Sequence, residues 1–310
     1  MPDPSRLASA LSPFSFEARR ALEAALEERA VVPAQLTRWL LSHEALDTEQ
    51  LLTRLLPVAM AYAEAPTSGF RVGAIAACRQ GGSSHDLHLG ANWEPPRGPL
   101  SFSVHAEQAA VVSAWVNNQT EIELLAVSAM PCGYCRQFLQ ELGSSPSLFI
   151  APREATAEPP LRSRLEELLP HPFGPRALGV SAALLSSPRT PLVSPPGAEP
   201  LLAAGIAAAE RSHAPYSGAL AAVALEAEDG AIVAAPYAES AAHNPSLAPL
   251  SAALVALVTQ RAPSAPRKIR RALLVEAQGK LSQRELTAAM LTNEAPNLTL
   301  EYHAAQRLEG

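Results

Sequence analysis

Two short stretches of the chain bring together side chains that bind metals and move protons. One is His105-Ala106-Glu107 and the other is Pro131-Cys132-Gly133-Tyr134-Cys135. An imidazole and two thiolates are donors that zinc prefers. Three protein ligands leave one of zinc's four tetrahedral positions open, and a water held there becomes a source of hydroxide near neutral pH. The pattern predicts a catalytic zinc site held by His105, Cys132 and Cys135.

A carboxylate accompanies the predicted ligands. Glu107 lies two residues after His105, which is too near to be ignored and poorly suited to a fourth ligand. A carboxylate beside an activated water has a natural role as general base and then general acid. We predict that Glu107 moves protons between the water and the substrate.

Two helix starts are expected to position these side chains. Cys132 and Cys135 lie one helical turn apart, so both sulfurs can reach one ion, and Pro131 suits a helix start. The first-turn N–H groups then lower the pKa of the thiols. His105 is expected to begin a second helix, which runs to about residue 117.

Each stretch taken alone has a less specific interpretation. A Cys-x-x-Cys pair also occurs in structural zinc sites and in redox dithiols, but a dithiol leaves His105 and Glu107 unexplained. A non-catalytic, zinc-stabilised binding protein predicts four protein ligands and has no need of Glu107. Cys78 is a conceivable fourth ligand, but it lies in an expected strand and is more typical of a small core side chain.

The surrounding pattern predicts a layered α/β domain. Three helical segments are expected first, with Pro57 kinking or interrupting the third. A strand hairpin with a turn at Gly81-Gly82-Ser83-Ser84 follows, and then alternating helices and strands. The expected helices are 16–26, 33–41, 48–64, 105–117 and 132–142, and the expected strands are 70–78, 87–91, 124–129 and 148–150.

The second half of the chain repeats the first. Ala65-Pro66-Thr67-Ser68-Gly69 and Ala214-Pro215-Tyr216-Ser217-Gly218 each precede a hairpin, and a helix over 251–258 follows the second hairpin. The matching order predicts a duplication. The second copy has Pro249-Leu250-Ser251-Ala252, or a near neighbour, in place of His105-Ala106-Glu107, and no cysteine follows Cys135. It therefore cannot build this zinc site.

We expect four parts along the chain. Residues 1–47 form an N-terminal helical segment and residues 48–154 form the catalytic zinc domain. Residues 155–195 connect the halves, with one helix at about 161–169. Residues 196–310 form a degenerate, non-catalytic domain.

Bulk properties favour a small-molecule enzyme in the cytoplasm. The 310 residues carry a net charge of −6 without a basic run, which lowers the expectation of nucleic-acid binding. The start Met1-Pro2-Asp3-Pro4 lacks the pattern of a secretory signal, and no continuous apolar stretch is long enough to span a bilayer. Three cysteines argue for reduced thiols and not a disulfide framework.

The motifs Ser103-Val104-His105-Ala106-Glu107-Gln108 and Pro131-Cys132-Gly133-Tyr134-Cys135-Arg136-Gln137-Phe138 resemble those of the cytidine deaminase family. The likeness is to its larger, two-domain homodimeric bacterial form and runs from about residue 48 to 260. It implies a duplicated three-layer α/β domain, with a central mixed sheet and helices on both faces, plus the N-terminal helical segment. It also implies hydrolysis of cytidine and 2′-deoxycytidine to uridine and 2′-deoxyuridine plus ammonia, by zinc-bound hydroxide with a glutamate proton shuttle, in pyrimidine salvage.

The resemblance also assigns roles to single residues. His105, Cys132 and Cys135 would hold one Zn²⁺ per chain, and Glu107 would be the shuttle. The remaining assignments concern the substrate: Asn92 and Glu94 would bind the sugar hydroxyls, Phe70 would lie against the pyrimidine, Phe173 would line the pocket, and backbone groups near Ala106 and Cys132 would orient the base.

Two further expectations follow from the resemblance. The Glu94 carboxylate would repel a phosphate, which favours free nucleosides over deoxycytidylate or RNA and argues against a related deaminase of another base or nucleotide. The degenerate half would help close the active site of a partner subunit in a homodimer, through Ala241-Ala242-His243-Asn244-Pro245. His243 stands where an aromatic residue is usual, and surface exposure would explain it equally well.

Overall fold

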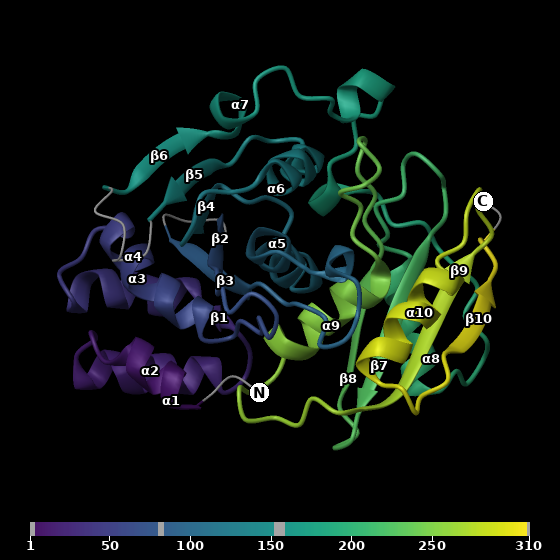
Figure 1. The fold of residues 1–310 in the computed structure, drawn as a ribbon, viewed down its shortest axis with the longest axis horizontal. Coiled ribbons are helices and arrows are strands. Elements are labelled where there is room, and N and C mark those ends of the chain that lie inside the picture. The colour runs from purple at the N-terminus through teal and green to yellow at the C-terminus, as the bar shows by residue number, and fades with distance from the viewer. Residues whose placement is uncertain (1–3, 80–83, 152–158, 309–310) are drawn as a thin grey trace.

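The computed structural model describes residues 4–79, 84–151 and 159–308 (Figure 1). Residues 1–3 and residues 81–83 of the expected hairpin turn lie outside this range, as does the expected boundary at 154/155. Within the described residues, the first sheet has the strand order β1-β3-β2-β4-β5-β6. Its strands are β1 (Val31–Val32), β2 (Gly73–Arg79), β3 (His85–Ala91), β4 (Leu124–Val127), β5 (Ser147–Ile150) and β6 (Leu161–Arg164).

The first sheet is mixed. β4 and β5 are parallel, and the other neighbouring strands are antiparallel. Alternate residues of β2 point to opposite faces: Ala74 and Ala76 join a core shared with the second sheet, whereas Ile75 and Ala77 join a core made with the N-terminal helices. Those helices are α1 (Pro4–Leu11), α2 (Phe16–Leu26), α3 (Ala34–His43) and α4 (Thr48–Met60).

The α4 helix begins at a capping box, in which Asp47 and Gln50 satisfy each other's backbone N–H groups. Pro57 was expected to kink or interrupt this helix. The helix continues without a break through Pro57 and ends three residues later, at Met60.

A second sheet of the described chain has the order β10-β9-β7-β8. β10 and β9 are parallel and the other pairs are antiparallel, as in the matching part of the first sheet. Its strands are β7 (Ala221–Ala227), β8 (Ile232–Pro236), β9 (Ile269–Ala277) and β10 (Glu301–Ala305), and its helices are α8 (Pro200–Ala209), α9 (Pro249–Thr259) and α10 (Arg284–Glu294).

The two sheets enclose a shared helical layer. The helices α5 (Ala106–Val116) and α9 lie between them and contact each other, and α6 (Gly133–Phe138) lies beside α5 (Figure 1). The helix α8 covers the outer face of the second sheet, as α4 covers that of the first. The predicted duplication, and the mixed sheet with helices on both faces, are confirmed.

A close backbone approach fixes α5 against the first sheet. A Cβ atom added to Gly90 of β3 would lie 2.1 Å from the backbone nitrogen of Ala110. Only glycine therefore permits this spacing between β3 and α5. Because α5 is enclosed between the sheets, all its residues from Ala106 to Trp115 are buried.

The expected helix at 161–169 is wrong in its first half. Residues Leu161–Arg164 form β6, which pairs antiparallel with β5, and only Leu165–Leu168 form a helix, α7. The open edge of β5 offers backbone hydrogen bonds that outweigh local helical preference. The expected helix at 132–142 divides into α6 and a 3₁₀ segment, η2 (Leu139–Leu142). Other 3₁₀ turns of the described residues are η1 (Leu100–Phe102), η3 (Pro175–Leu178) and η4 (Leu184–Ser186).

The helices of the described residues are too short or too polar to cross a bilayer.

Candidate active site

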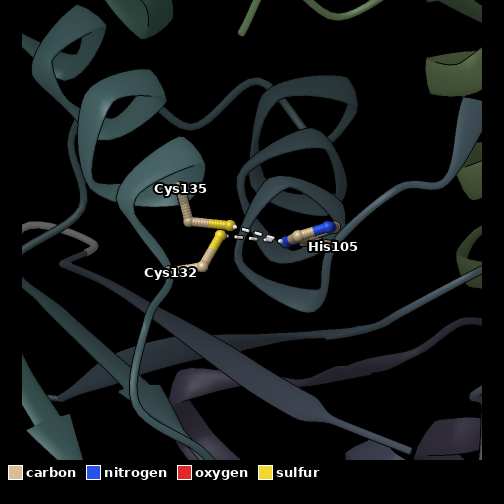
Figure 2. A group of neighbouring side chains, drawn as sticks. All are labelled: His105, Cys132 and Cys135. Atoms are coloured by element: carbon tan, nitrogen blue, oxygen red, sulfur yellow. Dashed lines mark hydrogen bonds between the residues drawn. The ribbon is translucent and has the colours of Figure 1, made fainter. Parts of the chain in front are cut away.

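The three predicted metal ligands meet at two helix starts (Figure 2). His105 is the residue before α5, where the side-chain oxygen of Gln108 accepts its backbone N–H at 3.3 Å. Cys132 is the residue before α6, and Cys135 lies in the first turn of that helix. The prediction that both helices begin at the ligands is confirmed.

The donor atoms have a spacing that suits zinc. His105 Nδ1 lies 3.4 Å from Cys132 Sγ and 3.2 Å from Cys135 Sγ, and the three donor atoms all lie within 4.8 Å of one another. Tetrahedral zinc with ordinary bond lengths would separate such donors by about 3.5–3.8 Å. The three residues therefore fit a zinc ion after a small adjustment.

No further protein donor joins this group among the described residues, so the site has three protein ligands. Cys78 is instead buried in the core between the sheets. Burial raises the pKa of its thiol to about 12. This placement agrees with a core role for Cys78, and it leaves the fourth zinc position for water or substrate.

The surroundings of Cys132 favour its thiolate. A hydrogen bond with the Cys135 thiol, the backbone N–H groups of Cys135 and Tyr134 and the charge of His105 lower the pKa of Cys132 to about 4, against the effect of burial. The same thiol–thiol hydrogen bond, together with burial, raises the pKa of Cys135 well above its usual value. Binding of a cation would remove the remaining proton from Cys135.

Glu107 lies in the first turn of α5 and is only 4% exposed. Burial raises the pKa of its carboxyl group above the usual value, and this carboxyl group is hydrogen-bonded with the thiol of Cys135. A raised pKa makes a carboxyl group a stronger base than an exposed one, which suits a group that takes and returns a proton. Its position beside the ligand group suits the predicted proton shuttle.

Asn92 and Glu94 fix the loop that precedes β2. Asn92 accepts the backbone N–H of Val72 at 2.8 Å and donates to the carbonyl oxygen of Phe70 at 2.9 Å. Glu94 accepts the backbone N–H groups of Thr67 and Ser68 at 2.9 and 3.0 Å, and also the Ser68 hydroxyl.

The hydrogen bonds to Glu94 also set its charge. Although burial opposes the effect, the bonds from Ser68 and Thr67 lower the pKa of Glu94. Its carboxyl group is therefore ionised at neutral pH. An ionised carboxylate offers about four acceptor positions, and three donors use three of them.

The two predicted aromatic contacts are surface residues. Phe70 is 53% exposed and Phe173 is 52% exposed, so Phe70 is not a core residue. The carbonyl oxygen of Phe173 accepts the Gln137 side-chain amide at 2.7 Å, which brings this segment beside α6. Ala106 is buried at the start of α5, one residue from His105.

Within the described residues, a surface hollow opens beside His105, and its lining does not include Phe70, Asn92, Glu94 or Phe173. His105, Tyr134 and Asn244 line it, with Leu100, Ser101 and Ser103. The sequence placed Asn244 in the segment expected to close a partner's site, whereas Leu100, Ser101, Ser103 and Tyr134 were not predicted to line a pocket, although the place of Tyr134 between the two cysteines was a usable signal. The Tyr134 hydroxyl donates to the Asn244 carbonyl oxygen at 2.7 Å.

The segment expected to close a partner's site lies here against α6 of its own chain. His243 has a φ of +60°, in the left-handed region, within a tight turn formed by its neighbours. His243 is exposed, which agrees with the surface interpretation of this position, and it does not line the hollow.

The second half keeps the backbone pairing that precedes the central helix, but it lacks the zinc ligands. Val104 pairs with Trp93 in the first half, and Leu247 pairs with Ala238 in the second. This register aligns His105-Ala106-Glu107 with Ala248-Pro249-Leu250, one residue before the predicted match. An alanine and a leucine thus stand where the first half has its histidine ligand and its glutamate.

Comparisons with known proteins agree with this arrangement. A family model described as the cytidine and deoxycytidylate deaminase zinc-binding region matches residues 46–151, and a second model of the same description matches residues 165–288. A cytidine deaminase of Sodalis glossinidius is 39% identical over 294 residues, covering 88% of this chain and 90% of its own. One of Shewanella amazonensis is 44% identical over 251 residues, covering 80% of each chain.

A solved structure of cytidine deaminase from Mycobacterium tuberculosis is 30% identical, with a TM-score of 0.34; the match covers 41% of this chain and 98% of that one. The fold and the three-ligand site define a zinc-dependent deaminase with a duplicated domain. The extent and identity of the sequence matches show that the chain belongs to the cytidine deaminase family.

Proposed function

We propose that this protein hydrolyses cytidine and 2′-deoxycytidine to uridine and 2′-deoxyuridine, releasing ammonia. The observation that carries the proposal is the group of His105, Cys132 and Cys135 with a buried Glu107 beside it. Relatives over most of the chain are cytidine deaminases, which supports the same substrate class. The reaction serves pyrimidine salvage and needs one zinc ion per chain.

When bound by the three ligands, zinc acts as a Lewis acid that makes a water nucleophilic near neutral pH. Glu107 accepts a proton as the water oxygen bonds to C4 of the cytosine, and it delivers that proton to N3. Glu107 then carries the second water proton to the amino group, the C4–N bond breaks and ammonia leaves. The raised pKa of Glu107 suits both directions of transfer.

The sugar is recognised by Asn92 and Glu94. The free acceptor position of Glu94 suits a ribose hydroxyl, and the second N–H of the Asn92 amide suits another. The ionised Glu94 disfavours a 5′-phosphate, so free nucleosides are preferred to nucleotides. The exposed rings of Phe70 and Phe173 supply apolar surface for the base, and backbone groups at Ala106 and Cys132 orient it.

The chain acts as a cytoplasmic homodimer whose C-terminal half adds to the cover of the partner's site. Exposed apolar surface favours a partner, and support comes from four large apolar side chains of the first half that the chain leaves exposed: Phe70, Leu100, Met130 and Phe173. We also propose that the chain divides into four parts, with boundaries at 1–47, 48–154, 155–195 and 196–310. Strand β6 of the connecting part forms the last strand of the first sheet.

One experiment tests the function. Zinc is measured per chain, and ammonia release is followed in parallel from cytidine, deoxycytidine, deoxycytidylate and adenosine. We expect about one zinc per chain and turnover of the two cytosine nucleosides alone. Bound zinc without turnover of any of these four substrates would contradict the proposal. The assignment of Asn92 and Glu94 to sugar binding would then be the first to be withdrawn.

A further inference from the structure

A buried carboxylate joins the two halves beside the zinc-ligand helix. Glu141 lies in η2, directly after α6, and its side chain is fully buried. One carboxylate oxygen accepts the backbone N–H of Ala241 at 2.8 Å. The other accepts Nε2–H of His213 at 3.0 Å and the Tyr216 hydroxyl at 2.8 Å. All three donors belong to the C-terminal half.

These partners are particular to the degenerate half. In the matching loops, His213 corresponds to Glu64 and Tyr216 to Thr67, because bridges and loop hydrogen bonds align the two segments. Neither residue of the first half has an aromatic ring that could reach a distant carboxylate in this way. The loop framework is thus common to both halves, whereas the contact with Glu141 is not.

The Ala241 N–H belongs to the segment that contributes Asn244 to the hollow beside His105. Residues 240–246 form a compact turn, in which His243 N–H donates to the Ser240 carbonyl at 2.8 Å and Ser246 N–H donates to the His243 carbonyl at 2.9 Å. Glu141 holds one side of this turn at Ala241. Tyr134 holds the other side at Asn244, which lines the hollow together with His105.

We propose that Glu141 is a positioning residue for substrate binding. It fixes the turn 240–246 as a wall of the hollow in its own chain, and Tyr134 fixes the same wall from the first turn of α6. A buried carboxylate forms strong hydrogen bonds to its donors, and a buried anion without them is costly. The degenerate half thereby acts on its own chain's active site; this effect on catalysis rests on the proposed cytidine deaminase function.

The central variant is Glu141→Gln, which keeps the size of the side chain and removes its charge. We expect KM for cytidine to rise about tenfold, from the loss of one charge-assisted hydrogen bond. We expect kcat to stay within about twofold and zinc to stay near one per chain, because the Glu141 carboxylate is hydrogen-bonded to His213, Tyr216 and Ala241 and not to the predicted ligands. Amide hydrogen exchange over residues 238–247 should quicken.

The matched control is Glu276→Gln. Glu276 is also a buried carboxylate with hydrogen-bond donors, the Ser282 hydroxyl and the Gln283 N–H, but these lie within the C-terminal half. This control should lower thermal stability while KM and the exchange of residues 238–247 stay as in the wild type. Tyr216→Phe removes one donor to Glu141 and should shift KM in the same direction by less, which keeps the test available if Glu141→Gln fails to fold.

A double-mutant cycle separates positioning from general destabilisation. Tyr134→Phe removes the second anchor of the turn. Because both anchors hold the same turn, the fold-increase in KM of the double variant should be smaller than the product of the fold-increases of the two single variants. The proposal would be overturned if Glu141→Gln had the KM and the hydrogen exchange of the wild type. It would also be overturned if kcat, zinc content and thermal midpoint all fell together in this variant. Multiplicative effects in the cycle would overturn it as well.

Hydrogen exchange also separates this inference from the proposed function. If the wild-type protein released no ammonia from cytidine, the proposed function would fall, while faster exchange over 238–247 in Glu141→Gln would still support the anchoring of the turn. If cytidine were deaminated and neither exchange nor KM changed in that variant, the anchoring role alone would fall.

Discussion

The two halves hold the same loop with the same kind of carboxylate. Glu94 accepts two successive backbone N–H groups at 2.9 and 3.0 Å, and Glu239 accepts the equivalent pair, from Tyr216 and Ser217, at 2.8 and 3.1 Å. A serine hydroxyl bonds the carboxylate in both loops. The carboxylate therefore has a structural role in both halves that does not depend on the zinc ligands.

The halves differ where the central helix begins. α5 starts beside a ligand and presents the buried Glu107, whereas α9 starts with Pro249 and presents Leu250, which is fully buried. Proline at the first helical position needs no N–H partner, and leucine packs in the core between the sheets. The chemistry was replaced by packing without loss of the fold, so the site and the scaffold can be perturbed separately.

The largest expected effect follows removal of a ligand. Cys135→Ser should lower zinc well below one per chain and leave no measurable turnover, because a serine hydroxyl is a poor zinc donor. Metal analysis and ammonia release measure both. The control is Cys78→Ala, which removes the third cysteine from the core at some cost in stability and should leave zinc unchanged. Loss of zinc in the control would instead indicate that Cys78 is a fourth zinc ligand.

Glu107→Gln should lower kcat by about 10³-fold or more while zinc remains bound, because the amide cannot carry the proton. The matched variant in the other half is Leu250→Met, a volume-conserving change at the equivalent helix position. It should leave kcat unchanged. Comparable turnover in Glu107→Gln and the wild type would contradict the shuttle and end the functional distinction between these two positions.

The zinc ligands and their helices could be predicted because their information is local. His105, Cys132 and Cys135 lie at helix starts that short patterns already indicate. The partners of Glu141 lie 72, 75 and 100 residues away, so no local pattern contains them. Likewise, the alignment of Ala248 with His105 needed the pairing of Leu247 with Ala238, which only the folded sheet supplies. Strand β6 was missed because β5, and not its own sequence, determines its structure.

A third comparison separates binding from folding in the paired loops. Glu94→Gln should raise KM for cytidine by roughly 10–100-fold, the range expected for a lost hydrogen bond to a charged group. It should also raise activity on deoxycytidylate relative to cytidine, because the repelling charge is gone.

Glu239→Gln is the counterpart in the degenerate half. It should lower the thermal midpoint with a much smaller change in KM, since Glu239 and its donors lie in the half that has no zinc ligands. Initial rates at several substrate concentrations measure both variants. Equal increases in KM would mean that the carboxylate of Glu94 acts only through the loop.

The smallest effect concerns an ion pair in each sheet that links equivalent strands. The arginine and the glutamate have exchanged strands between the two sheets. In the first sheet, Arg79 of β2 donates two hydrogen bonds to Glu123, just before β4, whereas in the second sheet Arg270 of β9 donates to Glu226 of β7. Hydrogen bonds from Arg79 and His85 lower the pKa of Glu123 to about 2. Both partners are half-exposed, so solvent screens the pair and limits its contribution.

Because the pKa of Glu123 is lower in the folded chain than its value of about 4.3 in an unfolded chain, the pair stabilises the fold above that pH. The contribution is lost as the pH falls from about 4.3 towards 2. Glu123→Gln should therefore lower the thermal midpoint by about 1–2 °C at pH 7, and the difference from the wild type should vanish near pH 2. Thermal unfolding across this pH range measures it, and a difference that persisted at pH 2 would show that packing and not charge links these strands.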